Sequence, residues 1–305
     1  MRGLIVDKLH PVVEEILGKH MSLDYKIFVS KEELVQVIGK YEVLIMRVDP
    51  VINRNILDHA SKLLVIGVGS AGLNHIDMEY ARTKGIRIVN APAMNAESVA
   101  ELTMGRIIDL MRHVPQANYN LKKKGIWDKY RYLGHELQGK TLGLVALGRI
   151  GARVAELASA FGMNILAFDP FLSHEQVAER GAKPVTLEEL FCQSDVISLH
   201  APLTEATRHM INRDALSKMK QGSYLLNMAR GELVDEEALY EALKEGKLAG
   251  AGGDVMEKEP CTISPLYELD NFIITPHIGA QTEEAQYRAG KHMSERVLKA
   301  LGMLN

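Results

Sequence analysis

Three short segments in the second half of the sequence carry a cation, an acid and an imidazole. They are NMARGELVD (227–235) with Arg230, GGDVMEKEP (252–260) with Glu259, and TPHIGA (275–280) with His277. A guanidinium can bind a substrate carboxylate or keto oxygen through its planar fork of donors. An imidazole can accept a hydroxyl proton and return it, and a neighbouring carboxylate can orient the ring and stabilise its charged form. The set is typical of a site that oxidises a hydroxy acid or reduces a keto acid.

Each of these three side chains also has a plainer explanation. Arg230 could be a surface cation, Glu259 one charge of the solvated run EKE, and His277 a loop residue after a proline. The combination favours function, because each segment follows an apolar run that predicts a parallel strand. The runs are SYLLNM (223–228), AGAGGDV (249–255) and FIITP (272–276). The carboxyl ends of parallel strands lie at one edge of a sheet, so we expect the three side chains to converge there.

A glycine-containing turn lies near the middle of the chain. It joins a predicted strand, TLGLVA (141–146), to a predicted helix, RIGARVAELASAFG (149–162). Its spacing, Ala146-x-Gly148-x-x-Gly151, is a variant of the dinucleotide fingerprint, in which the second glycine admits the pyrophosphate and the third lets helix and strand pack closely. Alanine at the first position is acceptable only if its φ is negative. The alternative is a strand–helix corner that binds nothing.

The residues after this turn predict which dinucleotide it would bind. The amides of Arg149 and Ile150 would open the helix and meet the phosphates at its positive end. Asp169 ends the next predicted strand, NILAFD (164–169), where an acid can bond the ribose hydroxyls. A carboxylate there repels a 2′-phosphate, and the following residues, PFLS, offer no arginine to receive one. The pattern predicts NAD rather than NADP.

Apolar runs alternate with helical spacings along the whole chain. Before residue 91 the runs are GLIV (3–6), KIFV (26–29), VLIM (43–46), LLVIGV (63–68) and IRIVN (86–90), and a second series begins at Thr141. Two long helical patterns, 96–112 and 282–299, frame the second series. This order predicts an α/β protein with two Rossmann-like, doubly wound parallel-sheet domains and a cleft between them. We expect an NAD-binding domain at 92–278, inserted into a flavodoxin-like substrate domain made of 1–91 and 279–305.

The composition excludes several classes of function. The chain has 305 residues, a net charge of −3, 47% hydrophobic and 25% charged residues, as is ordinary for a soluble globular protein and unfavourable for nucleic-acid binding. Cys192 and Cys261 are far apart, so we expect no disulfide framework and no metal site. No apolar run is long enough to span a membrane, and the N-terminus does not resemble a signal peptide. We therefore expect a cytoplasmic protein that acts on a small molecule.

The chain resembles the NAD-dependent D-isomer-specific 2-hydroxyacid dehydrogenases, most closely the 3-phosphoglycerate dehydrogenase and hydroxypyruvate/glyoxylate reductase branches. The resemblance covers nearly the whole length and rests on VIGVGSAGLNHID (65–77), NAPAMNAESVAELT (90–103), GKTLGLVALGRIG (139–151), HAPLTEATRHMI (200–211), NMARGELVDEEAL (227–239), DVMEKEP (254–260) and TPHIGA (275–280). It implies that Arg230, Glu259 and His277 are the catalytic set. It also implies cofactor contacts at Arg149, Ile150, Asp169, Pro202, Thr207, Ala229, Asp254 and Gly279.

The resemblance places the loop 68–72 and Asn95 near the substrate. There, free amides of Gly69 and Ser70 could bind a carboxylate as a backbone nest, although a plain glycine-rich turn explains the sequence equally well. The resemblance further implies a homodimer, in which we expect the apolar positions of helix 96–112 to contact the partner. Because the chain ends at Asn305, we expect no additional regulatory domain.

Two positions depart from the family pattern. Ala146 replaces the usual first glycine of the turn, and Val68 stands where phosphoglycerate enzymes often have an arginine. Arg47, Arg54 and Lys129 are the remaining candidate phosphate ligands. We favour 3-phosphoglycerate over glyoxylate or hydroxypyruvate as the substrate. The other readings are an NAD(H)-sensing binding protein without turnover and a formate-type enzyme, against which Glu259 argues.

Overall fold

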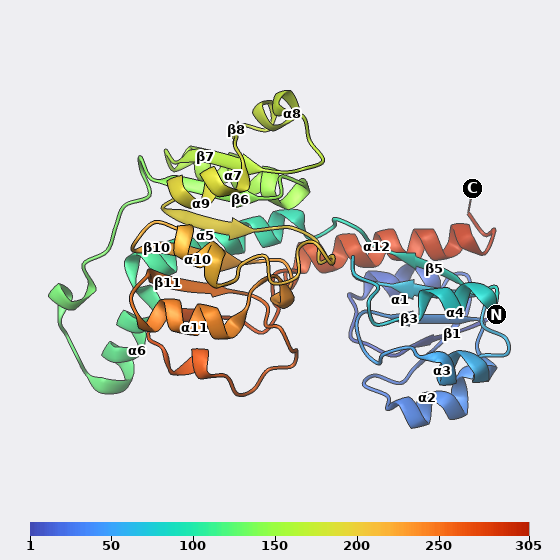
Figure 1. The fold of residues 1–305 in the computed structure, drawn as a ribbon. Helices are drawn as coiled ribbons and strands as arrows, with labels where there is room; N and C mark the ends of the chain where they lie inside the picture. Colours follow the sequence, from blue (N-terminus) through green and yellow to red (C-terminus); the bar gives the residue numbers. More distant parts are fainter. Residues whose placement is uncertain (305) are drawn as a thin grey trace. The chain divides into compact units, whose positions relative to one another are not determined.

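The computed structural model describes residues 1–304, which divide into two compact units (Figure 1). The first unit combines Met1–Asn95 with the chain from Ala280 onward, and the second is Ala96–Gly279. The expected boundaries, after residues 91 and 278, fall just before these. The second unit is therefore an insertion within the first.

The first unit is built on a five-stranded parallel sheet in the order β2-β1-β3-β4-β5. Its strands are β1 (Arg2–Ile5), β2 (Ser22–Tyr25), β3 (Val43–Met46), β4 (Val65–Val68) and β5 (Arg87–Asn90). The two central strands β3 and β4 consist of buried residues only, as expected where helices cover both faces of a parallel sheet. The strand order reverses between β1 and β3, and at such a reversal loops diverge and leave room for a ligand.

Helices cover both faces of this first sheet. They are α1 (Val12–Leu17), α2 (Lys31–Val37), the 3-10 turn η1 (Ile38–Lys40), α3 (Arg54–His59), α4 (Met78–Thr83) and α12 (Glu283–Ala300). Helices α1 and α12 share one apolar cluster, and α2, α3 and α4 share another. Side-chain caps from Ser30, Asn53 and Asp77 start three of these helices where the sequence changes from turn to helix.

One strand of this sheet lies earlier than predicted. The apolar run 26–29 was expected as the second strand, but β2 is Ser22–Tyr25. Phe28 has a φ of 61° and is 69% exposed, so the chain has already turned out of the sheet there. Because β2 is a short edge strand with polar residues, its sequence lacks the apolar run that indicates a buried strand.

The second unit is built on a seven-stranded parallel sheet in the order β12-β11-β10-β9-β6-β7-β8. Its strands are β6 (Thr141–Val145), β7 (Asn164–Phe168), β8 (Lys183–Pro184), β9 (Val196–Leu199), β10 (Ser223–Asn227), β11 (Leu248–Gly253) and β12 (Phe272–Ile274). The order reverses between β6 and β9, so this sheet also has a switch point. The prediction of two doubly wound parallel-sheet units is confirmed.

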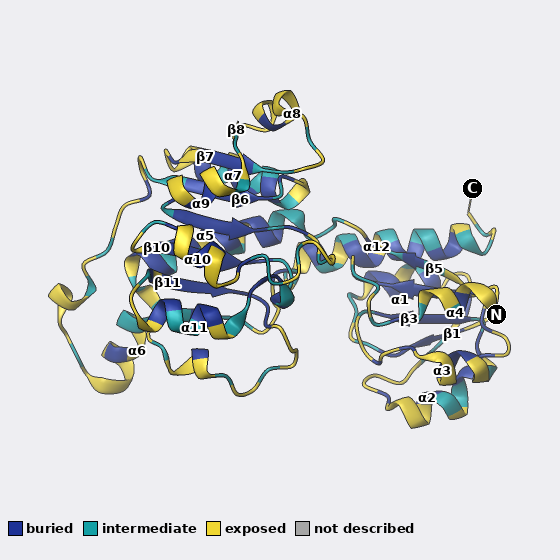
Figure 2. Cartoon of the chain, viewed as in Figure 1, coloured by how far each residue is buried: buried dark blue, intermediate teal, exposed yellow. Residues whose placement is uncertain are grey.

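Helices again cover both faces, as the burial pattern in Figure 2 shows. The helical elements are α5 (Ala96–Arg112), α6 (Val114–Lys124), η2 (Lys129–Tyr132), α7 (Arg149–Ala160), α8 (His174–Glu179), α9 (Leu187–Gln193), α10 (Arg213–Lys218), η3 (Gly231–Leu233), α11 (Glu236–Lys244) and η4 (Pro265–Glu268). Helices α5 and α7 contribute to one apolar cluster with the sheet, and α9, α10 and α11 to the other.

The long helix α5 has the predicted bounds but not the predicted role. Its apolar residues, including Val99, Met104, Ile107 and Leu110, are buried in the core of its own unit against α7 and the sheet. The expectation that these positions contact a partner subunit is therefore wrong. An amphipathic pattern shows that a helix buries one face, but it does not show against what.

Candidate active site

The structure brings Arg230, Glu259 and His277 together at the carboxyl edge of the second sheet. They follow β10, β11 and β12, which are neighbours in the sheet. The Oε2 atom of Glu259 lies 2.8 Å from Nδ1 of His277. The positive charge of Arg230 acts on the Glu259 carboxylate as well. A cation, an acid and an imidazole from three separate segments thus form one cluster.

Glu259 remains ionised in this cluster. Burial alone would raise its pKa, but the hydrogen bond from His277, the charges of His277 and Arg230, and the amide of Met256 together hold the pKa of Glu259 below its usual range. A carboxylate at Nδ1 keeps a proton on that nitrogen and leaves Nε2 of the ring to face a substrate. The His277 side chain is 50% exposed, so Nε2 can be reached from outside the protein.

Asp254 holds the loop that carries His277. Its carboxylate accepts hydrogen bonds from the amides of Ile278 and Gly279 at 2.7 and 2.6 Å and from the Thr275 hydroxyl at 2.7 Å. The backbone of His277 has a φ of 53°, and its amide donates to the Asp254 carbonyl at 2.9 Å. Asp254, expected as a cofactor contact, is buried and engaged with this loop.

The loop that carries Glu259 is fixed by two residues that were not among the predicted site residues. Glu236, the first residue of α11, accepts a hydrogen bond from the Glu257 amide at 2.7 Å. His209 pairs through Nε2 with the Glu257 carboxylate at 2.9 Å. Both bonds connect segments that are distant in sequence, so no local sequence pattern predicts them.

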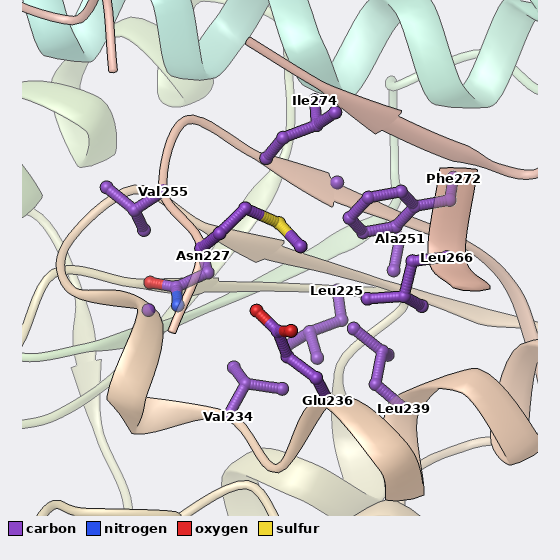
Figure 3. A pocket seen from close by; sticks show the side chains of 13 residues that line it. Leu225, Asn227, Val234, Glu236, Leu239, Ala251, Val255, Leu266, Phe272 and Ile274 are labelled. Atoms are coloured by element: carbon purple, nitrogen blue, oxygen red, sulfur yellow. The ribbon is translucent and has the colours of Figure 1, made fainter. Parts of the chain in front are cut away.

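A small cavity lies among the strands and loops that lead to the cluster (Figure 3). Its volume of about 20 Å³ is enough for one water molecule. Most of its lining is apolar, and the Glu236 carboxylate points into it beside Asn227 and Val255. The cavity is too small for a substrate, so substrate must meet the cluster from its exposed side.

Arg230 is oriented by its own backbone turn. The buried Asn227 donates to the Arg230 carbonyl at 2.7 Å and accepts from the Ala229 amide at 3.2 Å. The guanidinium donates to the Ala229 carbonyl at 2.7 Å. Within residues 1–304 the guanidinium forms no ion pair, so its charge is available to an anionic ligand.

The turn at 146–151 differs from the sequence expectation. Ala146 was expected to keep a negative φ, but its φ is 71°. Its amide donates to the Phe168 carbonyl at 2.8 Å, and a Cβ on Gly151 would lie 2.3 Å from the Ala146 carbonyl oxygen. The hydrogen bond and the close packing of α7 on the turn hold the alanine in the left-handed conformation, at a strain of about 1–2 kcal/mol.

The same turn has the features that a dinucleotide phosphate requires. Helix α7 begins after Gly148 without a side-chain cap, which leaves the amides of Arg149 and Ile150 for another acceptor. A Cβ on Gly148 would meet nothing within 4 Å, so there is open space beside the residue that precedes α7. These residues therefore fit the pyrophosphate of a dinucleotide.

Asp169 contacts the turn directly. Its carboxylate accepts from the Leu147 amide at 2.9 Å and from the Phe171 amide at 3.0 Å. The Leu147 carbonyl in turn accepts a hydrogen bond from the guanidinium of Arg180. No arginine directly follows Asp169 in the sequence; Arg180 comes after α8, and only the fold brings it back to the turn.

The chain after β9 reaches the other side of the switch point. Thr207 closes this loop, because its hydroxyl bonds the Pro202 carbonyl at 2.8 Å and accepts from the Thr204 amide at 2.8 Å. His200 starts the loop, and its Nε2 lies 3.0 Å from the Ser198 hydroxyl. Burial lowers the pKa of His200 to about 4, so the ring is neutral at physiological pH.

In the first unit, Arg47 lies at the switch point between β1 and β3. Arg47 directly follows β3, and Asp7 lies shortly after the end of β1. Burial lowers the pKa of Arg47, while the Asp7 charge opposes that shift. His75, which was not predicted, also senses the Asp7 charge, and its Nε2 is buried without a partner among residues 1–304.

In the backbone nest expected at Gly69 and Ser70, the Gly69 amide is not free. The Gly69 amide donates to the Met46 carbonyl at 2.8 Å, so it cannot bind a ligand. The Ser70 hydroxyl donates to the carbonyls of Arg47 and Gly72 at 3.1 and 3.2 Å, which ties this loop to the Arg47 backbone. Asn95 is the last residue of this part of the first unit and is partly exposed.

The other candidate phosphate ligands have partners of their own. Arg54 forms an ion pair with Asp77 at 3.0 Å and lies over the Tyr80 ring. Lys129 lies over the Tyr130 ring in η2 of the second unit. Arg47 therefore remains the cation with the fewest competing contacts.

Residues 1–304 contain neither a metal-binding cluster nor a helix that could span a membrane. No group of three or more His, Cys, Asp or Glu side chains is placed to hold a metal ion. No helix in the same residues has the length and apolar character needed to cross a membrane.

Comparisons with known proteins connect this geometry to a family. Residues 104–279 match the family described as D-isomer specific 2-hydroxyacid dehydrogenase, NAD binding domain. The chain is 46% identical over 98% of its length to a D-3-phosphoglycerate dehydrogenase of Methanocaldococcus jannaschii, of which it spans only 57%. It is 45% identical over 90% of its length to a hydroxypyruvate reductase of Thermotoga maritima, of which 89% is covered. A D-lactate dehydrogenase of Aquifex aeolicus, solved with NAD and lactic acid, superimposes with a TM-score of 0.84 at 35% identity, covering 99% of this chain and 96% of that one.

Proposed function

We propose that this chain, which belongs to the D-isomer-specific 2-hydroxyacid dehydrogenase family, interconverts a D-2-hydroxy acid and its 2-keto acid with NAD(H), and that its substrate is 3-phosphoglycerate. The observation that carries the proposal is the 2.8 Å contact between Glu259 and His277, with the Arg230 charge acting on the same carboxylate. The dinucleotide turn lies at the carboxyl edge of the same sheet.

Each member of the cluster has one task in this reaction. NAD held at the turn 146–151 would supply the acceptor for the hydride of the hydroxyl-bearing carbon. His277 takes the hydroxyl proton at Nε2, because Glu259 keeps Nδ1 protonated and stabilises the positive ring that results. Arg230 binds the carboxylate or keto oxygen of the substrate through its planar donors. In the reverse direction His277 returns the proton.

The cofactor contacts come from the switch point of the second sheet. We assign the phosphates to Gly148, Arg149, Ile150 and Gly151 and the adenosine ribose to Asp169. Pro202, Thr207 and Ala229 complete the proposed contacts. Asp254 and Gly279 act by shaping the loop of His277, since the Asp254 carboxylate is bonded to that loop.

For the substrate we assign Arg47, Ser70 and Asn95 as contacts, and we leave out Gly69 because its amide donates to the Met46 carbonyl. Two features support 3-phosphoglycerate: a relative that carries this name, and the partly buried Arg47, whose guanidinium forms no ion pair within residues 1–304. Val68 favours the alternative, hydroxypyruvate or glyoxylate, because this fully buried valine offers no cation to a phosphate. A relative named hydroxypyruvate reductase supports the same alternative.

Steady-state kinetics across a short series of 2-keto acids test these assignments, with NADH absorbance as the readout. We expect phosphohydroxypyruvate to give the highest kcat/KM, and Arg47→Gln to raise KM for the phosphorylated acid only. Equal or faster turnover of unphosphorylated acids overturns the phosphoglycerate assignment. We expect His277→Ala and Arg230→Ala to lower kcat/KM by at least about 10²-fold while NADH binding persists. NADH binding without reduction of any keto acid would leave a dinucleotide-sensing protein instead.

We also propose that the chain forms a homodimer through the segment 114–133, which includes α6 and η2. Much of this segment is exposed (Figure 2), and its exposed large apolar side chains include Val114, Tyr119, Leu121, Trp127, Tyr130 and Leu133. Trp127 is 85% exposed and Leu133 is 89% exposed. Apolar residues gathered in this way on a surface favour an interface, and a second copy is the occupant implied by a symmetric homo-oligomer.

Sedimentation at micromolar concentration tests the dimer. We expect a dimer for the wild-type chain and a monomer for Trp127→Glu combined with Leu133→Glu, with Ile263→Glu, an equally exposed apolar residue elsewhere, as the control. A wild-type monomer contradicts the proposal.

We place the reaction in the cytoplasm, where Cys192 and Cys261, both free thiols, stay reduced.

A further inference from the structure

The Leu147 backbone is held between two side chains of opposite charge. Its amide donates to Asp169 Oδ2 at 2.9 Å, and its carbonyl accepts from Nη1 of Arg180. Arg180 is exposed, and its guanidinium forms no other hydrogen bond or ion pair within residues 1–304. An anionic and a cationic group thus flank one residue of the dinucleotide turn.

These two charges act in opposite directions on the adenosine end of a dinucleotide. A carboxylate in the position of Asp169 accepts the ribose hydroxyls of NAD and repels a 2′-phosphate. A guanidinium beside that position attracts a 2′-phosphate, which carries between one and two negative charges and can accept several hydrogen bonds. Four of the five guanidinium N–H donors of Arg180 remain after the bond to Leu147.

We propose that Arg180 is a selectivity residue of the cofactor site, which binds the 2′-phosphate of NADP(H) and gives the protein an affinity for NADPH that Asp169 opposes. The inference rests on the proposed placement of the dinucleotide on the turn 146–151. With both charges present, NADH binds more tightly than NADPH. Removal of Asp169 alone exposes the contribution of Arg180.

A purely structural role for Arg180 has a different signature. If the guanidinium only braced the turn through the Leu147 carbonyl, its loss would weaken both dinucleotides to the same extent, because they share every group except the 2′-phosphate. The ratio of the two dissociation constants therefore separates the two roles. A structural effect on folding would appear in the melting temperature.

The experiment measures dissociation constants of NADH and NADPH by nicotinamide fluorescence for the full chain and its variants. We expect Arg180→Gln to weaken NADPH about tenfold and NADH less than about threefold, as the loss of one charge-assisted contact predicts. Asp169→Ser should strengthen NADPH relative to NADH. Asp169→Ser combined with Arg180→Gln should lose most of that gain. Lys183→Gln removes another exposed cation, on β8, and should leave the ratio unchanged.

An unchanged ratio in Arg180→Gln, or an equal loss of both dinucleotides, overturns the role of Arg180. One further variant separates this failure from a failure of the proposed site. Gly148→Val fills the open space over the turn and should weaken both dinucleotides strongly. If Gly148→Val binds NADH as the wild type does, the placement of the cofactor is wrong and the inference falls with it. If Gly148→Val loses NADH while Arg180→Gln leaves the ratio unchanged, only the inference about Arg180 is wrong.

Discussion

Replacing Gly231 with alanine tests whether the position of the Glu259 loop controls the chemistry. Gly231 follows Arg230 and lies against the backbone of that loop. A Cβ at Gly231 would be 1.9 Å from the Met256 carbonyl carbon, 2.0 Å from its oxygen and 2.2 Å from the Glu257 nitrogen. All three atoms belong to backbone, so no side-chain rotation relieves the contact.

The displacement can be worked out from these distances. Ordinary van der Waals contact for such a Cβ begins near 3.4 Å, so the two backbones must separate by about 1.5 Å. A shift of that size away from His277 takes the 2.8 Å contact of Glu259 beyond hydrogen-bond range. Misplacement of a catalytic group by about 1 Å can lower the rate about 10²-fold. We therefore expect kcat of Gly231→Ala to fall about 10²-fold.

The assay combines steady-state kinetics with NADH binding and thermal melting. NADH binding should persist, because the turn 146–151 follows β6 on the other side of the switch point. Gly105→Ala is the matched control: Gly105 lies on the exposed side of α5 with nothing within 4 Å of its Cβ position. That variant should keep kcat and gain about 0.5–1 kcal/mol of stability. A folded Gly231→Ala protein whose kcat stays within about threefold of the wild type refutes the reasoning.

Three further predictions concern the turn, the switch point and the His277 loop. Ala146→Gly removes the strain of a φ of 71°. Even after the greater chain entropy of glycine in the unfolded state is deducted, the free energy of unfolding should rise by about 0.5 kcal/mol or more. Urea denaturation would measure this change, and a lower stability of the variant would contradict the prediction. Burial in the folded protein lowers the pKa of His200 from 6.5 to about 4. Between these pH values the unfolded chain therefore binds a proton that the folded protein excludes. The contribution of His200 to stability is complete above about pH 6.5 and declines as the pH falls towards 4. His200→Gln should therefore flatten the dependence of stability on pH in that range, and an unchanged slope would refute the assignment. Asp254→Asn places an amide where the Ile278 and Gly279 amides donate, so it should lower kcat and destabilise the protein by about 1–3 kcal/mol, whereas wild-type activity would show that the loop does not need the carboxylate.

Sequence patterns were sufficient for the elements that bury continuous apolar surface. Helix α5 has the bounds that its periodicity predicted, and the strands before Arg230, Glu259 and His277 lie where apolar runs placed them. The edge strand β2 was misplaced because a strand at the rim needs little apolar sequence. A strand buried on both faces has a continuous apolar run in the sequence, whereas an edge strand does not need one.

For the candidate site too, some features could be predicted from the sequence and others could not. Residue types and their positions after strands predicted that a cation, an acid and an imidazole would meet, since parallel strands end at one edge. The partners of these residues could not be predicted: Asp254 binds the His277 loop, the Gly69 amide is used by Met46, and Arg180 returns to the turn. Each of these bonds joins segments that lie far apart in the chain.

Periodicity and residue chemistry are local properties, so the amino-acid sequence alone was enough to predict the α/β alternation, the order of the two units and the candidate reacting groups. The left-handed backbone of Ala146, the burial of α5 within its own unit and the partner of each carboxylate depend instead on long-range contacts that the fold creates. The physical reason is that a hydrogen bond or a positive φ is stabilised by whichever group the fold brings within about 3 Å.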